Sequence, residues 1–270
     1  MRESKILLMT ICATVCLSFV SCGNDKGDEP GAVGGKQCRI TAVKCETTDY
    51  VYPSDEETSY YSNFQYEDDK IAGYSYDIKY GDDSTSGKSS YSYSTSTISA
   101  KKDGKTLATY TLENNLIVSG KDYWGKKWTY CYDSDNHLTE IKDKNGDILF
   151  DCEWKDGNLI AYQDKSRDKT YTITYSGQTN TLGFLPVEIY DEYLDGDDGR
   201  MLDAILCAEG YFGKMPDKFP SKVVGNGDIK QETAISYSEL NKYGYPAKMV
   251  VEYFYNREHW SDTYTFSWDK

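Results

Sequence analysis

The stretch Trp128-Thr129-Tyr130-Cys131-Tyr132-Asp133 carries the pattern that decides the fold of this chain. Aromatic side chains alternate in it with smaller residues, and a period of two is typical of a strand with one buried face. Turn residues follow, and Leu138 comes after them. The stretch therefore predicts a β-strand that turns back into a second strand near Leu138.

The same unit recurs along the chain. It consists of an aromatic residue or a Cys, any residue, an aromatic residue, a few turn residues and then a Leu. The leucines lie 22, 21 and 23 residues apart, at Leu116, Leu138, Leu159 and Leu182. A single hairpin is marginally stable alone, so neighbouring hairpins are expected to pair. We predict a mainly β fold, a long curved antiparallel meander of repeated hairpins (open or barrel-like), with strand order following chain order over residues 105–182.

Turn and helix signals complete the predicted architecture. Tight turns are expected at Asp103-Gly104, Asn145-Gly146, Asp156-Gly157 and Asn226-Gly227, because these pairs supply positive φ angles. Between residues 198 and 208 apolar side chains recur at helical spacing, with Asp198 as N-cap and Gly210 as stop. We predict one helix there, packed on the sheet, and a final hairpin that turns near residues 256–261.

The first twenty-two residues predict where in the cell the protein is located. Arg2 and Lys5 give a basic start, an apolar run covers residues 6–20, and Ser21 precedes Cys22. This order is typical of a secretory signal, and the small residue before a Cys is similar to a bacterial lipoprotein signal cut before Cys22. The alternative is a buried helix or an uncleaved anchor, although the run is shorter than the about 20 residues that a membrane span needs.

We predict three parts: a lipoprotein signal peptide at 1–21, a flexible acidic tether at 22–36, and a single tyrosine-rich β domain at 37–270. The tether is rich in Gly, Asp and Glu, a composition that buries too little apolar area to fold. Its acidic residues after Cys22 resemble the export signal of Bacteroidetes surface lipoproteins; a solvated spacer is the alternative. The predicted location is the outer membrane, lipid-anchored, at the cell surface or on the periplasmic face.

The charge of the chain excludes some partners. The net charge is −14, and removal of residues 1–21 (Arg2, Lys5 and Glu3) leaves 249 residues at −15. Phosphate backbones require Lys and Arg for neutralisation, so we expect no nucleic-acid partner. Direct adhesion to anionic lipid is disfavoured for the same reason, and the expected membrane contact is the lipid on Cys22.

Five cysteines follow Cys22: Cys38, Cys45, Cys131, Cys152 and Cys207. None makes a CxxC or zinc spacing. Cys38 and Cys45 are seven apart, so on a continuous strand they face opposite sides. The repeat places Cys131 and Cys152 on opposite faces of strands that an intervening strand separates. We therefore predict no disulfide between Cys131 and Cys152, and a buried Cys152.

The sequence holds no recognisable catalytic signature. His137 and His259 lie at turns, where a lone His is usually solvated. We therefore predict no enzyme and no cofactor. A structural Ca²⁺ near Asp195 and Asp197 is the metal alternative, but Arg200 stands where a calcium loop needs its tight-turn glycine, so a capped loop is preferred.

The ligand-binding candidates are Trp124 and Trp128, which flank a Gly125-Lys126-Lys127 turn. Exposed aromatic rings at a turn can act as platforms for sugars, whereas the alternative is ordinary packing of aromatic side chains in the sheet.

The repeated Tyr-x-Tyr-Asp, turn and Leu resembles the hairpins of YD-type repeat proteins. A lipoprotein signal, tyrosine-rich hairpins, a helix ending in Gly210-Tyr211-Phe212-Gly213, and a closing aromatic hairpin follow in that order. Over residues 58–270 this order resembles a family of uncharacterised Bacteroidetes lipoproteins, defined only as a domain of unknown function. The resemblance implies the fold and the envelope address and no activity.

These observations favour a lipid-anchored envelope lipoprotein that acts as a non-catalytic binding module for a glycan or a protein partner. An envelope structural or assembly role, in which an edge strand pairs with a partner, is the first alternative. A glycan hydrolase that uses two carboxylates is the second, because such pairs have no fixed spacing in sequence.

Overall fold

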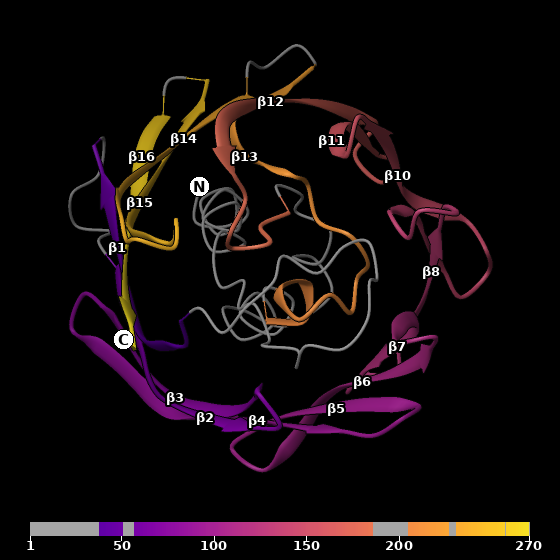
Figure 1. The fold of residues 1–270 in the computed structure, drawn as a ribbon, viewed down its shortest axis with the longest axis horizontal. Helices are drawn as coiled ribbons and strands as arrows, with labels where there is room; N and C mark the ends of the chain where they lie inside the picture. The colour runs from indigo at the N-terminus through magenta and orange to yellow at the C-terminus, as the bar shows by residue number, and fades with distance from the viewer. Residues whose placement is uncertain (1–37, 51–56, 186–204, 227–230, 257, 270) are drawn as a thin grey trace.

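The computed structural model describes residues 38–50, 57–185, 205–226, 231–256 and 258–269. In this part of the chain sixteen strands form one closed barrel, and every neighbouring pair is antiparallel (Figure 1). The predicted signal peptide, the tether, Cys22 and the acidic run with Asp195 and Asp197 lie outside the described residues.

The strands follow one another around the barrel in chain order, which confirms the predicted meander. They are β1 (Ile40–Asp49), β2 (Glu57–Glu67), β3 (Lys70–Tyr80), β4 (Asp83–Tyr93), β5 (Thr97–Lys102), β6 (Lys105–Glu113), β7 (Leu116–Asp122), β8 (Lys127–Tyr132), β9 (Leu138–Asp143), β10 (Ile148–Lys155), β11 (Asn158–Asp164), β12 (Lys169–Thr179), β13 (Lys218–Gly225), β14 (Gln231–Leu240), β15 (Pro246–Tyr255) and β16 (Glu258–Trp268).

The barrel closes where the first strand meets the last. β1 pairs with β16 from Ile40 opposite Trp268 to Asp49 opposite Trp260. Closure pairs the edges that an open meander would leave unsatisfied. The sixteen described strands therefore offer no free edge for strand addition.

Left-handed residues make two of the predicted tight turns; at Asn145-Gly146 only Gly146 has positive φ, and Gly227 lies outside the described residues. Asp103 and Gly104 have φ angles of 48° and 79°, and Asp156 and Gly157 have 50° and 72°. Positive φ at both central residues matches the twist of the flanking strands. The last hairpin turns between Tyr255 and Glu258, as expected from the sequence.

The repeat unit corresponds to a recurring hydrogen bond between strands. In the second half of six even-numbered strands, a Tyr hydroxyl or Trp indole N–H donates to the carbonyl of the first or second residue of the preceding strand, at 2.7–2.9 Å. The pairs are Tyr66 to Ile40, Tyr93 to Ile71, Tyr132 to Ile117, Trp154 to Leu138, Tyr175 to Leu159 and Trp268 to Pro246. A buried aromatic ring thus keeps its polar group satisfied. In two of these pairs the acceptor is a leucine of the repeat, Leu138 for Trp154 and Leu159 for Tyr175.

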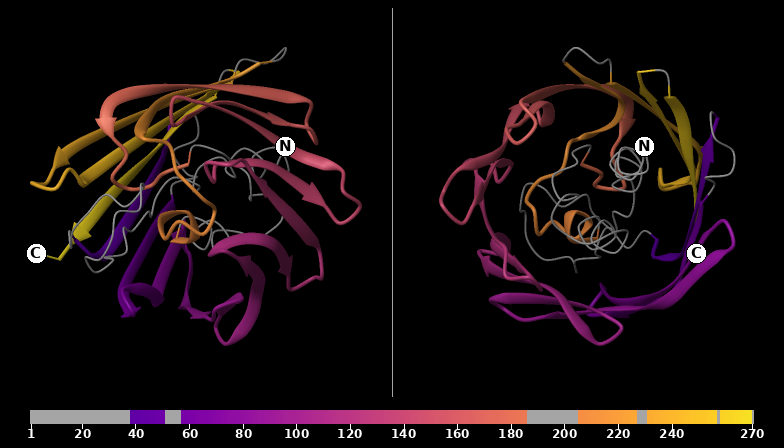
Figure 2. Two further views of the ribbon diagram at one scale, coloured as in Figure 1. Left: turned by 45° about the vertical axis from the view of Figure 1, so that its right-hand side comes forward. Right: turned by 180° about the vertical axis from the view of Figure 1, so that it is seen from behind.

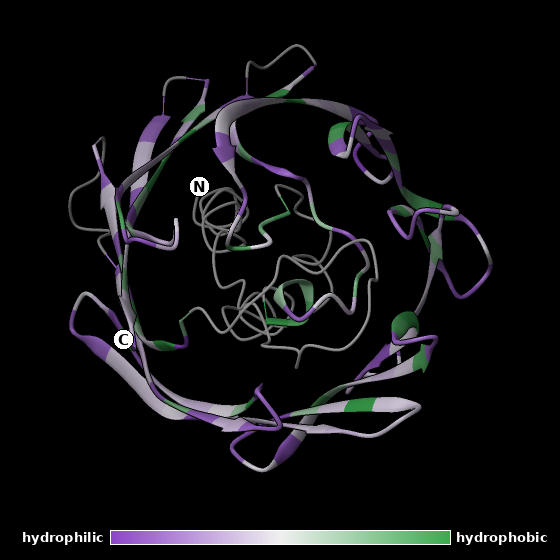
Figure 3. Cartoon of the chain, in the orientation of Figure 1, coloured by the Kyte–Doolittle hydropathy of each residue, from purple (hydrophilic) through white to green (hydrophobic). Residues whose placement is uncertain are grey.

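The two faces of the wall differ in chemistry. Side chains that point inward are buried and mostly aromatic or aliphatic, as with Tyr110, Tyr130 and Phe150. Alternate residues point outward and are mostly polar, although the exposed Tyr60 and Phe254 also face out. On β4, β6, β10 and β12 the exposed outward residues are Ser86, Lys88, Ser90, Ser92, Thr109, Thr111, Glu113, Asp151, Glu153, Lys155, Thr172 and Thr174. Hydrophilic colours accordingly cover much of the wall in Figure 3.

The segment between β12 and β13 fills part of the interior, and we call its described residues, 180–185 and 205–217, the plug. Figures 1 and 2 show the plug inside the ring of strands. Phe212 is fully buried, and its ring lies 6.2 Å from that of Tyr110 and 5.3 Å from that of Tyr130. The backbone of Tyr211 also accepts a hydrogen bond from the Ile117 N–H at 2.8 Å.

The helix lies in the plug. Residues 205–208 are helical, residues 198–204 lie outside the described part, and Gly210 ends the helix with φ of 75°. The packing of the predicted helix against the sheet is confirmed, but on the inside of a closed wall. A ring of sixteen strands is too wide for its own side chains to fill, so the chain supplies the remaining packing.

The cysteines confirm one prediction and correct another. Cys131 and Cys152 are not joined: Cys152 is buried, Cys131 lies on the outer face, and β9 separates their strands. Cys38 and Cys45 both pack against the core, so their expected opposite orientation was wrong. A bulge between Ile40 and Ala42 inserts one residue and shifts the alternation along β1.

Two glycines of the plug provide a matched stability test. Gly210 and Gly213 both have positive φ, but a Cβ on Gly210 would meet open space, whereas one on Gly213 would lie 2.1 Å from the Asn136 carbonyl oxygen. We expect Gly210→Ala to cost about 1–2 kcal/mol of unfolding free energy and Gly213→Ala to cost more than about 3 kcal/mol. Urea denaturation measures both. Equal costs would contradict the docking of the plug against the β8–β9 turn.

Candidate functional site: the plug contact and an exposed aromatic hairpin

The barrel has two chemically different ends. β12 ends and β13 begins at the end where the plug enters, which we call the plug end. The opposite end, which we call the far end, carries the connections β3–β4, β5–β6, β7–β8, β9–β10, β11–β12 and β15–β16 among others. Binding residues are often found on such connections, because a rigid scaffold holds them at the surface.

The β7–β8 connection at the far end presents two aromatic rings. Trp124 is 58% exposed and Tyr123 is 48% exposed, and their ring centroids lie 3.7 Å apart. Asp122 shapes this turn, since its Oδ1 accepts a hydrogen bond from the Lys126 N–H at 2.8 Å. The backbone N–H of Tyr123 donates to the carbonyl of Leu107 at 3.0 Å and ties the turn to β6.

The structure separates the two tryptophans that the sequence singled out. Trp124 lies exposed at the turn, whereas Trp128 is 5% exposed and points into the barrel with Tyr130. The two rings therefore do not form one surface. Trp124 remains a ligand-binding candidate and has Tyr123 as its neighbour, while Trp128 packs in the wall. The alternation of aromatic residues from Trp128 to Tyr132 in the sequence already indicates that Trp128 belongs to the buried face of its strand.

The β5–β6 and β7–β8 hairpins, which adjoin and carry the exposed rings, are rich in lysine. Residues 99–107 and 119–129 hold six lysines, Lys101, Lys102, Lys105, Lys121, Lys126 and Lys127. The same segments contain two acids. Asp103 accepts hydrogen bonds from the Lys88 N–H and the Tyr76 hydroxyl, and Asp122 is buried in its turn. Hydrogen bonding by the Lys88 backbone lowers the pKa of Asp103, so this carboxylate stays ionised. Its hydrogen bonds hold the β5–β6 turn against β3 and β4.

A second polar cluster holds the plug to the wall. Glu209 Oε1 accepts a hydrogen bond from the Ile71 N–H at 2.7 Å. Lys70 donates to the Tyr211 hydroxyl and lies over the rings of Tyr93 and Tyr211, 5.2 and 5.0 Å from their centroids. Burial raises the pKa of Glu209 to about 7, although the Ile71 hydrogen bond and the Lys70 charge oppose the rise.

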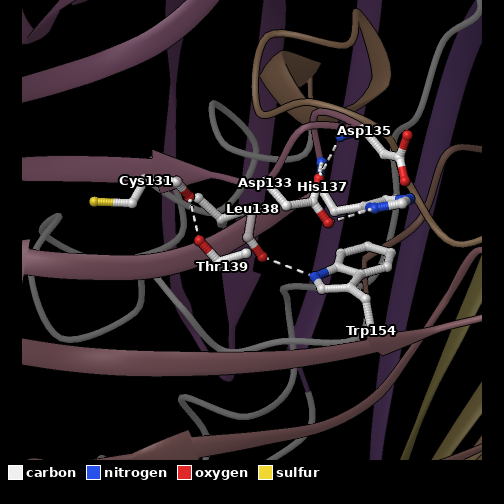
Figure 4. Close-up of polar contacts among 7 residues, drawn as sticks. All are labelled: Cys131, Asp133, Asp135, His137, Leu138, Thr139 and Trp154. Carbon is white, nitrogen blue, oxygen red and sulfur yellow. Dashed lines mark hydrogen bonds and ion pairs between the residues drawn. The ribbon is translucent and has the colours of Figure 1, made fainter.

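His137 has a structural place in the β8–β9 turn (Figure 4). Its ring stacks on Trp154 at 4.5 Å, and its Nδ1 lies 3.0 Å from Asp133 Oδ2. Burial of Asp133 raises its pKa, but hydrogen bonds from His137 and Asp135 outweigh this and lower the pKa overall. The expectation of a solvated His137 was wrong, because the turn folds the ring onto β10.

His259 lies at the far end in a stack of three rings. Tyr50 and Phe254 lie on either side of it, each with a centroid distance of 4.4 Å. Its Nε2 lies 3.5 Å from Glu252 Oε1. The described residues hold no group of three or more His, Cys, Asp or Glu side chains arranged for a metal ion. Within the same residues, no helix is long and apolar enough to cross a membrane.

A solved crystal structure has a similar fold. The barrel is similar to a crystal structure of a porin-like protein from Bacteroides uniformis, with a TM-score of 0.63 and 12% sequence identity over 85% of this chain and 96% of that chain. At this identity the likeness shows the fold alone. No protein-family model matches the sequence, and no curated protein sequence matches it. The resemblance to YD-type repeats and to Bacteroidetes lipoproteins thus rests on the sequence motifs.

The raised pKa of Glu209 predicts a pH dependence of stability. Its pKa is about 7 in the folded protein against an ordinary value of 4.5, so the folded state holds the proton more tightly. The resulting stability is fully present below pH 4.5 and is lost as pH rises through about 7. We expect wild type to lose about 2–3 kcal/mol between pH 5 and pH 8 through this group.

Glu209→Gln tests this contribution, because the amide cannot ionise. Urea denaturation at both pH values should show a smaller loss of stability in this variant than in wild type. Glu239→Gln, at an exposed position of β14, is the control and should keep the wild-type pH dependence. The same pH dependence in wild type and Glu209→Gln would refute the burial of this carboxyl in the plug contact.

Proposed function

We propose that this chain is a lipid-anchored protein of the cell envelope that acts as a non-catalytic binding module for a glycan or a protein. In this proposal Cys22 carries the lipid, the tether links it to Cys38, and the barrel stands in water beside the outer membrane. The similarity to a porin-like barrel supports an envelope setting, and the signal sequence supports the lipid.

The polarity of the outer wall carries the proposal. A barrel that spans a bilayer exposes an apolar band about 25 Å tall to lipid, with polar residues facing the lumen. In this barrel most of the exposed outward residues are Ser, Thr, Lys, Asp and Glu, with Tyr60 and Phe254 among the exceptions, and the buried inward residues are mainly Tyr, Ile and Phe. A wall of this kind favours water on its outer surface. We therefore infer a porin-like shape used outside the bilayer.

The packing of the interior supports a role other than conduction. A sixteen-stranded porin leaves an aqueous channel. Here Phe212, Leu206 and Leu182 of the plug are fully buried within the barrel. A ligand would then be met at the turns and rings of the barrel ends, where Trp124 and Tyr123 are exposed.

A Cys22→Ala variant tests the anchor. We expect wild type to sediment with membranes and to incorporate a radiolabelled fatty acid, whereas Cys22→Ala should be unlabelled and recovered in the soluble fraction. Cys38→Ala is the matched control and should leave labelling unchanged, because Cys38 is buried in the barrel. Unlabelled wild type, or ion conductance by the purified protein in planar bilayers, would refute the proposed function.

A further inference from the structure

We propose that the far-end turn of β7–β8 binds an anionic polysaccharide, one that carries carboxylate groups along a chain of sugar rings. The site, which we call the lysine–aromatic patch, consists of Lys121, Tyr123, Trp124 and Lys127. This inference rests on the proposed binding function and names the ligand class.

The exposed rings supply the apolar half of such a site. Tyr123 and Trp124 lie against each other at 3.7 Å and both face solvent. Trp124 is more exposed to solvent than the other four tryptophans of the chain. Trp128 and Trp260 are buried, and Trp154 and Trp268 are half-buried. A held aromatic surface can pack on the C–H face of a sugar at a low cost in conformational entropy.

The strand register supplies the charged half. Lys121 on β7 lies directly opposite Lys127 on β8, and both point to the outer face. Like charges directly opposite across a strand pair are unfavourable. Neither lysine forms an ion pair with a carboxylate among the described residues. An anion beside both ammonium groups would relieve this repulsion.

The neighbouring hairpin extends the positive charge. Lys101 and Lys105 lie on the β5–β6 hairpin, one strand away from Tyr123 through its bond to Leu107. Residues 99–107 and 119–129 of these two hairpins contain six lysines and two aspartates, a net charge of +4, although the whole chain carries −14 and Asp103 interacts with the charges of Lys102 and Lys105. The local sign is therefore opposite to that of the molecule, which favours an anionic ligand at this position.

The shape of the patch favours a polymer. The rings stand on a projecting turn, where a small molecule would bury little of its surface. A chain of repeated acidic sugars can bind there through several weak contacts that add together. A nucleic acid offers rings and charge as well, so oligo(dT) is the competing polyanion that the test includes.

Polygalacturonate and its fully methyl-esterified form are a matched pair of probes, because esterification removes the charge and keeps the sugar chain. We would measure their binding to the full-length protein in detergent by calorimetry. We expect at least tenfold weaker binding by the ester and by Trp124→Ala. The double variant Lys121→Gln/Lys127→Gln should also bind at least tenfold more weakly and lose most of its salt dependence.

Matched controls lie elsewhere on the barrel. Tyr243→Ala removes an exposed ring near the plug end, and Lys79→Gln/Lys155→Gln removes two exposed lysines from other strands. Both should bind polygalacturonate as wild type does. A second measurement is fluorescence quenching: the ratio of iodide quenching to caesium quenching should be lower in the lysine double variant than in wild type, because the two ammonium groups attract iodide and repel caesium.

Several results would overturn the inference. They are equal binding of polygalacturonate and its ester, unchanged binding by Trp124→Ala, equally tight binding of oligo(dT), or the same ratio of iodide to caesium quenching in wild type and the lysine double variant. Failure here is distinct from failure of the proposed function. A wild-type protein that is held in the membrane by Cys22 but does not bind polygalacturonate refutes this inference alone.

Discussion

The pairing of β1 with β16 is the constraint on which the rest of the structure depends. Once the first and last strands bond, sixteen strands enclose a space that wall side chains alone cannot fill. The connection between β12 and β13 supplies the missing packing with Phe212 and the short helix at 205–208. The plug is thus a consequence of closure, and the Glu209 contact with the wall is part of what holds it.

Closure also decides which face of the wall meets water. With the aromatic rings turned inward onto the plug, the alternate positions face out, and in this sequence most of the exposed ones are Ser, Thr, Lys, Asp and Glu. The same alternation in a membrane barrel has the reverse sense. Under the proposed function, a barrel of porin-like shape has its outer wall in water, and the exposed turns at the barrel ends are the places where it would contact ligands.

Local features of the fold could be predicted from sequence, and long-range ones could not. Period-two runs, Asp-Gly turns and the leucine spacing gave the meander, the end of the helix at Gly210 and the separation of Cys131 from Cys152. The same hairpins could form an open or a closed sheet, so neither the closure of the barrel nor the internal plug could be predicted from the sequence. The bulge near Ile40 has no sequence signal, and it reversed the side expected for Cys45. At the candidate site, Trp124 could be found by its turn, but the opposition of Lys121 and Lys127 required the strand register.

Thiol labelling tests most directly which face of the barrel wall meets water. Cys131 lies on the outer face of β8, whereas Cys152 is buried inside, and burial raises the pKa of the Cys152 thiol to about 12. The membrane-bound protein would be treated with a charged, membrane-impermeant thiol reagent, and the labelled peptides identified by mass. A water-facing wall predicts that Cys131 reacts in the native protein and that Cys152 reacts only after unfolding. A protected Cys131 together with a reactive Cys152 would indicate a lipid-facing wall around a water-filled lumen and would contradict this account.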